Sequence, residues 1–290
     1  MEGILTLSLC VISTCLLLTG LRFVQRFPID LPLLVGVNYA SAALVGWIQH
    51  PAAFSHVFAH PVMGVFACLQ GFAFFGLFTL MGWMSRTVGV GYMTIVAKMS
   101  LVMPVVFAWL YYGDAMPWLR FVGVGLALVA IFLINFGEKG KSADQRASAG
   151  MLILLSIVLF LGSGASDILF KILKMDYNGL VGDEEYVIVL FAAAAIASLP
   201  VFVMRLAKGN LKLGAPTLLG GLVLGIPNYY SIAFLVGSLK FFDATVFYPI
   251  NNTAILLVMA LVGVVIFREK LNKWKAIGLL LATAAVVMLG

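Results

Sequence analysis

Long apolar runs separated by short polar breaks follow one another along the whole chain. Ten such runs cover residues 3–21, 31–48, 61–84, 90–112, 117–136, 149–173, 186–205, 214–238, 243–266 and 273–290. They lack the alternation of apolar and polar positions that is typical of strands. Each run is close to the ~20 residues with which a helix crosses a bilayer. Because lipid cannot satisfy backbone polar groups, we predict an all-α integral membrane protein with ten transmembrane helices.

Composition supports a membrane location for most of the chain. Of 290 residues, 63% are hydrophobic and 10% are charged, and the mean hydropathy is +1.10. A soluble domain has about 25% charged residues. The net charge of +6 comes from basic residues scattered over the breaks, so no nucleic-acid partner is expected. We expect the partners to be the bilayer and a small-molecule substrate, with the chain acting as a monomer or a homodimer.

The first run and the cysteines limit the location and the chemistry further. The opening "MEGILTLSLCVISTCLLLTGL" has no basic segment, and its apolar stretch is too long for a signal peptide, so we interpret it as a retained first helix. The cysteine and histidine spacings predict neither a disulfide framework nor a metal site, and no cofactor is expected. The residues concerned are Cys10, Cys15, Cys68, His50, His56 and His60.

The two halves of the chain match weakly when the first is shifted by 155 residues. "GDAMPWLRFVGVGLALVA" (113–130) then lies over "REKLNKWKAIGLLLATAA" (268–285). An acidic turn, a basic residue and a helix glycine recur in order: Asp114 with Glu269, Arg120 with Lys275, and Gly123 with Gly278. With five helices per half, the second copy must be inverted in the membrane. We therefore predict repeats over 1–137 and 149–290, joined by a polar loop over 138–148, as in secondary transporters.

The stretch "RTVGVGYMTIVAKMSLVMPVVFAWLYYGDAMPWLRFVGVGLALVAIFLINF" resembles an EamA-like domain of the drug/metabolite transporter superfamily. The resemblance rests on Pro104, the turn Gly113-Asp114 and Gly123, and on Glu269 and Gly278 in the second half. It implies two copies of a five-helix domain over the whole chain. It also implies an exporter or exchanger of small metabolites, without naming the substrate.

The basic residues predict an orientation in the membrane. Thirteen of the 18 Lys and Arg residues lie in or beside the breaks after odd-numbered runs, and four lie beside the breaks after even-numbered runs. Basic loops stay in the cytoplasm, so the count places both termini outside the cell (inner) membrane. The family resemblance implies the opposite, with both termini in the cytosol. We follow the count.

Lys98 is an isolated charge in the run 90–112, within "VAKMSLVMP". At 1.5 Å per residue it lies roughly 12 Å from the nearer end of its helix. A charge at such depth costs at least ~2.5–3.5 kcal/mol unless it is partnered or hydrated. The side chain is either a structural tie or, as we favour, a substrate-binding group in a wet cavity. Asp167 is an acid that could pair with it, although Asp167 also stands four residues before Lys171, the spacing of a local ion pair or a coupling pair.

Other polar side chains inside the runs are candidates for the same cavity. "FYPINNT" places Tyr248, Asn251 and Asn252 beside Pro249, which breaks the helix and frees a backbone carbonyl. The 155-residue shift puts Asn251 to Thr253 opposite residues 96–98, at a similar depth. Alternatively, these side chains only form hydrogen bonds between helices and have no role in substrate binding. Further candidates for substrate binding are Asn228 and Tyr229 in "GIPNYYS", together with Gln70 and Tyr92.

Several functions lack their usual residues. The first run has no carboxylate within it, which disfavours the proton-coupled export of cationic drugs known from small multidrug relatives. No HExxH motif or nucleotide-binding loop is present, so we do not expect an enzyme. The leading hypothesis is a secondary transporter of a small polar metabolite, anionic or zwitterionic, such as an amino acid. The alternatives are a flippase of a lipid-linked head group with the same fold, and a non-transporting membrane scaffold or receptor.

The charge count leads to a testable topology. A reporter fused after Gly290 is expected to give the signal of the periplasmic side, and a tag in 138–148 that of the cytoplasm, because basic loops resist translocation. Activity of paired alkaline phosphatase and fluorescent-protein fusions measures this. The reverse pattern at both positions would favour the orientation that the family resemblance implies.

Overall fold

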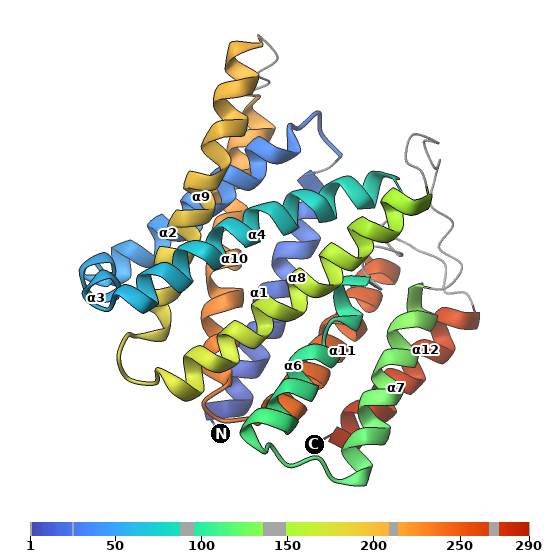
Figure 1. The fold of residues 1–290 in the computed structure, drawn as a ribbon. Coiled ribbons are helices and arrows are strands. Elements are labelled where there is room, and N and C mark those ends of the chain that lie inside the picture. Colours follow the sequence, from blue (N-terminus) through green and yellow to red (C-terminus); the bar gives the residue numbers. More distant parts are fainter. Residues whose placement is uncertain are drawn as a thin grey trace. The chain divides into compact units, whose positions relative to one another are not determined.

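The described part of the computed structural model is predominantly helical (Figure 1). It describes residues 2–24, 26–87, 96–135, 149–208, 214–266 and 273–289. Within these ranges there is no β-strand, and one isolated bridge joins Asn178 to Val181. The helices are α1 Glu2–Val24, α2 Leu31–Gln49, α3 Ala53–Ala59, α4 Pro61–Thr87, α6 Val102–Phe107, the π-helix η1 Ala108–Tyr112, α7 Trp118–Asn135, α8 Ala149–Asp176, α9 Asp183–Ala207, α10 Ala215–Ser238, α11 Ala244–Val265 and α12 Lys273–Leu289.

Seven helices in the described part are long and apolar enough to cross a membrane, namely those at 2–24, 31–49, 61–84, 150–176, 183–207, 215–238 and 244–263. Their lengths of 19 to 27 residues match the thickness of a bilayer. Shorter apolar helices over Val96–Tyr112, Trp118–Leu133 and Ala276–Ala285 lie where the remaining runs were predicted. The chain is thus an all-α, multi-pass membrane protein.

Many large apolar side chains remain exposed on the helices. On α8, for example, Ile153, Leu154, Ile157 and Leu161 are each between 49% and 60% exposed. A soluble protein rarely shows so large a continuous apolar surface. A lipid environment removes the cost of this exposure, in agreement with the predicted class.

Polar residues at the breaks set where the helices begin and end. Asp30 accepts a hydrogen bond from the backbone N–H of Leu33 and so caps the start of α2. Glu185 accepts one from the backbone N–H of Gly182 at the start of α9. Gly113 ends η1 with a φ of 71°, a left-handed conformation that suits glycine. The seven-residue helix α3, inside the break after α2, was not predicted.

The chain forms two compact units, each drawn from both halves of the sequence. The first consists of Met1–Thr79 and Leu173–Gly237, and the second of Leu80–Ile172 and Ser238–Gly290. These units follow the packing of the helices and differ from the sequence repeats over 1–137 and 149–290. In each unit, segments far apart in the sequence must therefore meet.

In the first unit α2 packs extensively against α9. Leu17, Leu34 and Leu224 form part of its apolar core, and bring α1, α2 and α10 together. Polar contacts supplement this core, including the bond from the Tyr39 hydroxyl to the carbonyl oxygen of Phe74, 3.3 Å. Hydrogen bonds between helices are common in membranes, because no water is available there as an alternative partner.

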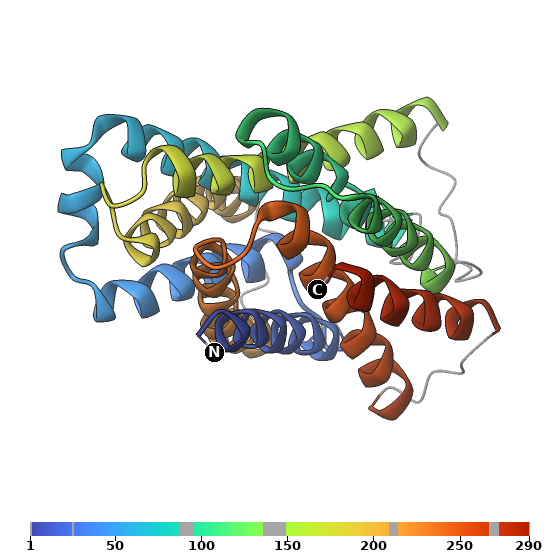
Figure 2. The same cartoon turned by 90° about the horizontal axis from the view of Figure 1, so that it is seen from below.

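In the second unit α7 packs extensively against α12, and the two helices lie side by side in both views (Figures 1 and 2). α11 contacts both of these helices and α6. α11 is also the most buried of the long apolar helices in the described part, together with α2. It is therefore the helix around which the second unit is assembled.

α4 and α9 approach closely at Gly71. A Cβ atom there would lie 2.3 Å from the backbone oxygen of Leu190 and 2.7 Å from the Cβ of Ala193. Small residues permit such contacts between helices in membranes. Gly76, further along α4, faces open space, and a Cβ atom added there would meet nothing within 4 Å.

This contrast gives a matched pair of variants. Gly71→Ala should destabilise the protein by roughly 1–3 kcal/mol, because the backbone of α9 cannot yield easily. Gly76→Ala should be neutral or slightly stabilising, since alanine favours a helix by up to ~1 kcal/mol over glycine. Melting temperatures of the purified variants in detergent measure the difference. Equal effects at the two positions would contradict the close approach.

Candidate functional site

A ladder of polar contacts follows one face of α11, in the otherwise apolar second unit. Thr245, Tyr248 and Asn252 are spaced three and four residues apart, which places them on the same side of the helix. Each is buried, with at most 8% of its surface exposed. Their contacts reach the turn after η1, α8 and the helix that carries Lys98. We call these contacts the α11 ladder.

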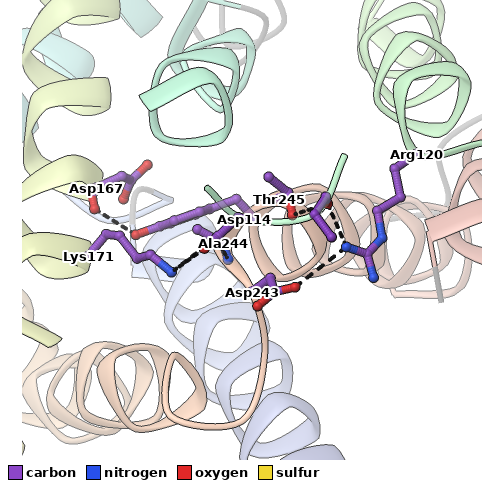
Figure 3. Close-up of polar contacts among 9 residues, drawn as sticks. Asp114, Arg120, Asp167, Lys171, Asp243, Ala244 and Thr245 are labelled. Atoms are coloured by element: carbon purple, nitrogen blue, oxygen red, sulfur yellow. Dashed lines mark hydrogen bonds and ion pairs between the residues drawn. The ribbon is translucent and has the colours of Figure 1, made fainter. Parts of the chain in front are cut away.

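Asp114 occupies the outer end of the ladder, beyond η1 (Figure 3). One of its carboxylate oxygens accepts a hydrogen bond of 2.9 Å from the backbone N–H of Ala244, at the first turn of α11. A negative charge there also interacts favourably with the helix dipole. The Nζ atom of Lys171 on α8 lies 3.0 and 3.3 Å from the two carboxylate oxygens. Asp114 thereby joins the turn, α8 and α11.

The Asp114–Lys171 pair is almost wholly removed from solvent. The exposed fraction is 7% for the Asp114 side chain and 3% for that of Lys171. The ring of Tyr112 lies 5.5 Å from the Lys171 nitrogen and adds a cation–π contact. Such a pair needs both partners, because either charge alone would be buried without compensation.

A second, more exposed ion pair lies beside the first. Arg120 at the start of α7 reaches Asp243 at 3.5 Å, and also donates to the carbonyl oxygen of Ala115 at 2.7 Å. The hydroxyl of Thr245 donates to the same carbonyl at 3.3 Å. Figure 3 shows how these contacts gather around the first turn of α11. They fix the turn 113–117 against α7 and α11.

The next rung is formed by Tyr248. Its hydroxyl donates a 2.7 Å hydrogen bond to the backbone carbonyl of Asp167 on α8. Tyr248 is 1% exposed. The bond crosses between two helices and ties the second turn of α11 to α8.

Lys98 and Asn252 form the innermost rung. The Nζ atom of Lys98 donates to the Oδ1 atom of Asn252 at 2.9 Å. The charge of Lys98 also acts on the carboxylate of Asp167. Counted along α11 at 1.5 Å per residue, Asn252 lies about 12 Å from Ala244. The lysine is thus held at depth by an amide from another helix.

Two further polar atoms near this rung have no protein partner among the described residues. They are the Oδ1 atom of Asn251 and the Oγ1 atom of Thr253, both fully buried. A buried polar atom without a hydrogen-bond partner reduces stability by about 1–3 kcal/mol. Such atoms commonly bind a water molecule or a ligand. Pro249 lies one turn before Thr253 and removes a backbone hydrogen bond within the same helix.

The chemistry of this arrangement is that of a binding site for a polar molecule. A lysine supplies a positive charge, and the neighbouring amide and hydroxyl groups supply donors and acceptors. No cluster of three metal ligands occurs among the described residues. The groups present can hold a ligand and orient it.

The predicted contacts of Asp167 and Lys171 differ from those observed. The spacing predicted a local pair of these two residues on α8. Lys171 instead binds Asp114, because its side chain reaches the turn that follows η1. Asp167, one helical turn away, interacts with Lys98. The ion pair of Lys171 therefore joins α8 to the turn after η1.

Three other predicted residues belong to the first unit and have contacts there. Gln70 accepts a 2.7 Å hydrogen bond from the hydroxyl of Tyr186. The side-chain amide of Asn228 donates to Asn38 on α2. The buried hydroxyl of Tyr229 has no partner among the described residues. Tyr92, Glu269 and the loop 138–148 lie outside the described residues.

Sequence reasoning missed two participants. Asp114 was singled out only because it matches Glu269 in the second half. No nearby sequence feature indicates that it pairs with Lys171, which is 57 residues away. Asn38 is a lone polar residue in the apolar run 31–48, and that isolation was a usable signal that it pairs with a partner on another helix.

Comparisons with known proteins place the fold and leave the family open. An uncharacterized protein of Haemophilus influenzae is 25% identical over 195 residues, which cover 66% of this chain and 63% of that protein. A solved crystal structure of a protein aligns with 99% of this chain and 96% of its own, with a TM-score of 0.75 and 14% identity. No protein-family model matches the chain. The chain therefore shares its fold with a protein of known structure.

The two ion pairs beside α11 should differ in strength. Asp114→Asn leaves Lys171 buried without its counter-charge and should destabilise the protein by about 3–5 kcal/mol. Asp243→Asn breaks a pair that is 25% and 48% exposed, and should cost at most ~1 kcal/mol. Unfolding in mixed micelles by denaturant measures both. Adding Lys171→Met to Asp114→Asn should restore part of the loss, and failure to do so would contradict the pairing.

Proposed function

We propose that the chain is a secondary transporter that moves a small polar metabolite, anionic or zwitterionic, across the membrane by alternating access. The observation that carries this proposal is the innermost rung of the α11 ladder. It is a lysine held at membrane depth beside two buried polar atoms without protein partners among the described residues. Charges of this kind inside membrane proteins commonly lie on a substrate or ion pathway.

The roles of the individual residues follow from their chemistry. Lys98 attracts the carboxylate or phosphate of the substrate and exchanges its contact with Asn252 or Asp167 for one with the ligand. Asn251, Asn252 and Thr253 offer hydrogen bonds from α11, next to the break at Pro249. Tyr248 holds α11 to α8 and so positions this segment. Asp167 balances the charge of the lysine between transport steps.

Two helix pairs support the inverted repeat that alternating access requires. Under the 155-residue shift α2 corresponds to α9, and α7 corresponds to α12. Each of these pairs packs extensively within its own unit. Helices related by an inverted repeat meet in this way when the pseudo-twofold axis passes between them. The proposal includes ten crossings, with the repeats over 1–137 and 149–290.

The proposed membership and topology follow from the sequence. We infer that the protein is an EamA-like member of the drug/metabolite transporter superfamily, located in the inner membrane with both termini outside. The proposed topology requires that contacts join breaks on the same side of the membrane, and two ion pairs agree with this. Asp30 and Arg205, both beside odd-numbered breaks, form one pair, whereas His50 and Glu184, both in even-numbered breaks, form another.

A lipid-head-group flippase is the second candidate, and one surface feature favours it. An open, apolar groove of about 630 Å³ lies between the helix over 96–112 and α8, the same helices that carry Lys98 and Asp167. Its lining residues include Val102, Met103 and Ile168. A groove of this kind could accommodate an acyl chain while the head group contacts the lysine.

A ligand screen tests the proposal and separates its two forms. The melting temperature of the purified protein is measured with amino acids, organic acids, nucleotide sugars and anionic lipids. A ligand that binds the folded state in 100-fold excess over its Kd stabilises it by about 2.7 kcal/mol. Lys98→Met should abolish the shift given by any such ligand. Lys174→Met, which removes a buried lysine of the first unit, should retain it.

The access of water to Lys98 can be tested without knowing the ligand. Lys98→Cys, in a background lacking Cys10, Cys15 and Cys68, should react with a small charged thiol reagent, because thiolate chemistry needs water and a reachable sulfur. Bound ligand should slow the reaction. An inert cysteine, together with a Lys98→Met variant that keeps ligand binding, would show that Lys98 is a structural tie.

A further inference from the structure

The packed pair of α2 and α9 carries charged contacts at both of its ends, in the first unit. At one end Asp30, before α2, meets Arg205 in the last turn of α9. At the other end His50, after α2, meets Glu184 in the first turn of α9. The two helices therefore run in opposite directions. We call the two sets of contacts the arginine clasp and the histidine clasp.

The arginine clasp is built around a buried carboxylate. The Asp30 side chain is 2% exposed, caps the start of α2 and accepts a hydrogen bond from Arg205. The backbone N–H of Asp30 donates to the hydroxyl of Thr217 at 3.2 Å, which adds α10 to the contact. Arginine stays protonated throughout the physiological pH range. The charge of this clasp is thus constant.

The histidine clasp consists of two pairs that reach from the α2–α3 segment to the start of α9. His50 Nε2 lies 3.1 Å from Glu184, and His56 Nδ1 lies 2.7 Å from Glu185. The charge of His50 also acts on Glu185. The histidine side chains are 36% and 59% exposed, so protons from solution reach them.

The two clasps occupy corresponding places in the proposed repeat. A shift of 155 residues carries Asp30 onto Glu185 and His50 onto Arg205. In each clasp an acid at the start of one helix meets a base at the end of the other. The bases differ, however, and with them the response to pH. A histidine ordinarily gains its charge between pH 8 and 5.

We propose that the histidine clasp is a proton-operated fastening of one end of the α2–α9 pair, while the arginine clasp holds the other end at any pH. Protonation of His50 and His56 turns the contacts of two neutral imidazoles with Glu184 and Glu185 into ion pairs. Acidification then tightens the contact between the α2–α3 segment and α9, and neutral pH loosens it.

Other charged and titratable groups lie around the histidine clasp. Lys174 on α8 binds Asp183 at 2.7 Å. Glu184 acts electrostatically on Tyr229 of α10, and Tyr230 is hydrogen-bonded to Gln49. His60 lies at the end of α3, outside the two pairs.

The consequence for transport rests on the proposed function and topology. The Lys and Arg count assigns the break that holds the histidines to the outside of the membrane. The exterior proton concentration would then bias the transporter toward a state closed on that side. The clasp itself is a property of the first unit and can be tested without any substrate.

Hydrogen exchange measured by mass spectrometry tests the clasp in the full-length protein. After correction for the intrinsic rate, amides in α3 and in the first two turns of α9 should exchange about three- to tenfold more slowly at pH 5.5 than at pH 8, as expected for two exposed ion pairs. The double variant His50→Gln/His56→Gln should lose this dependence. His60→Gln, in the same loop, should keep it, and amides at the start of α2 should show none in any variant.

Three results would overturn the inference. Exchange at the start of α9 that does not vary with pH in the native protein shows that protonation does not tighten the contact. A response that survives in the double variant assigns it to other groups. An equal response at the start of α2 shows a change of the whole unit. Because no ligand is needed, none of these outcomes depends on whether the chain transports anything.

Discussion

The need to partner every polar group in an environment without water governs this structure. Backbone groups meet it by forming helices throughout the described part of the chain. Side chains meet it in pairs drawn from different helices: Lys98 with Asn252, Lys171 with Asp114, and Gln70 with Tyr186. Each pair is a specific tie in a surface that is otherwise uniformly apolar. Polar residues therefore select which helices become neighbours, and apolar residues provide the area over which they pack.

The same requirement explains why α11 both holds neighbouring helices together and carries the candidate site. Asp114 caps its first turn, Tyr248 ties its second turn to α8, and Asn252 holds Lys98. The outer contacts are complete, whereas Asn251 and Thr253 retain polar atoms without a partner among the described residues. A helix that is rigidly held at one end and incompletely satisfied further in is suited to present polar groups to a ligand. Pro249 adds a local weakness in the helix at the boundary between these two regions.

The sequence was sufficient to predict the all-α membrane class and the seven long apolar helices of the described part, because hydropathy reports directly on the solvent of each segment. It also indicated Lys98 and Asn252 as residues of similar depth, through the shift between halves. It could not predict that Lys171 would choose Asp114 over Asp167, since that choice depends on which loop α8 approaches. Nor could it predict the bond between Asn228 and Asn38, which needs the distance between α2 and α10. Local patterns define elements, and tertiary packing selects among equally suitable partners.

The composition of the two units has a consequence for biosynthesis. The first unit needs residues 173–237 to complete the packing that begins with residues 1–79, and the second needs residues 238–290 to complete that of 80–172. The helices of the amino-terminal half therefore leave the ribosome before their partners exist. They must wait in the membrane, individually stable through their own backbone hydrogen bonds, until the second half is inserted. Neither unit can therefore be completed before the second half of the chain is synthesised, and a chain truncated at its midpoint would leave both units without their closing helices.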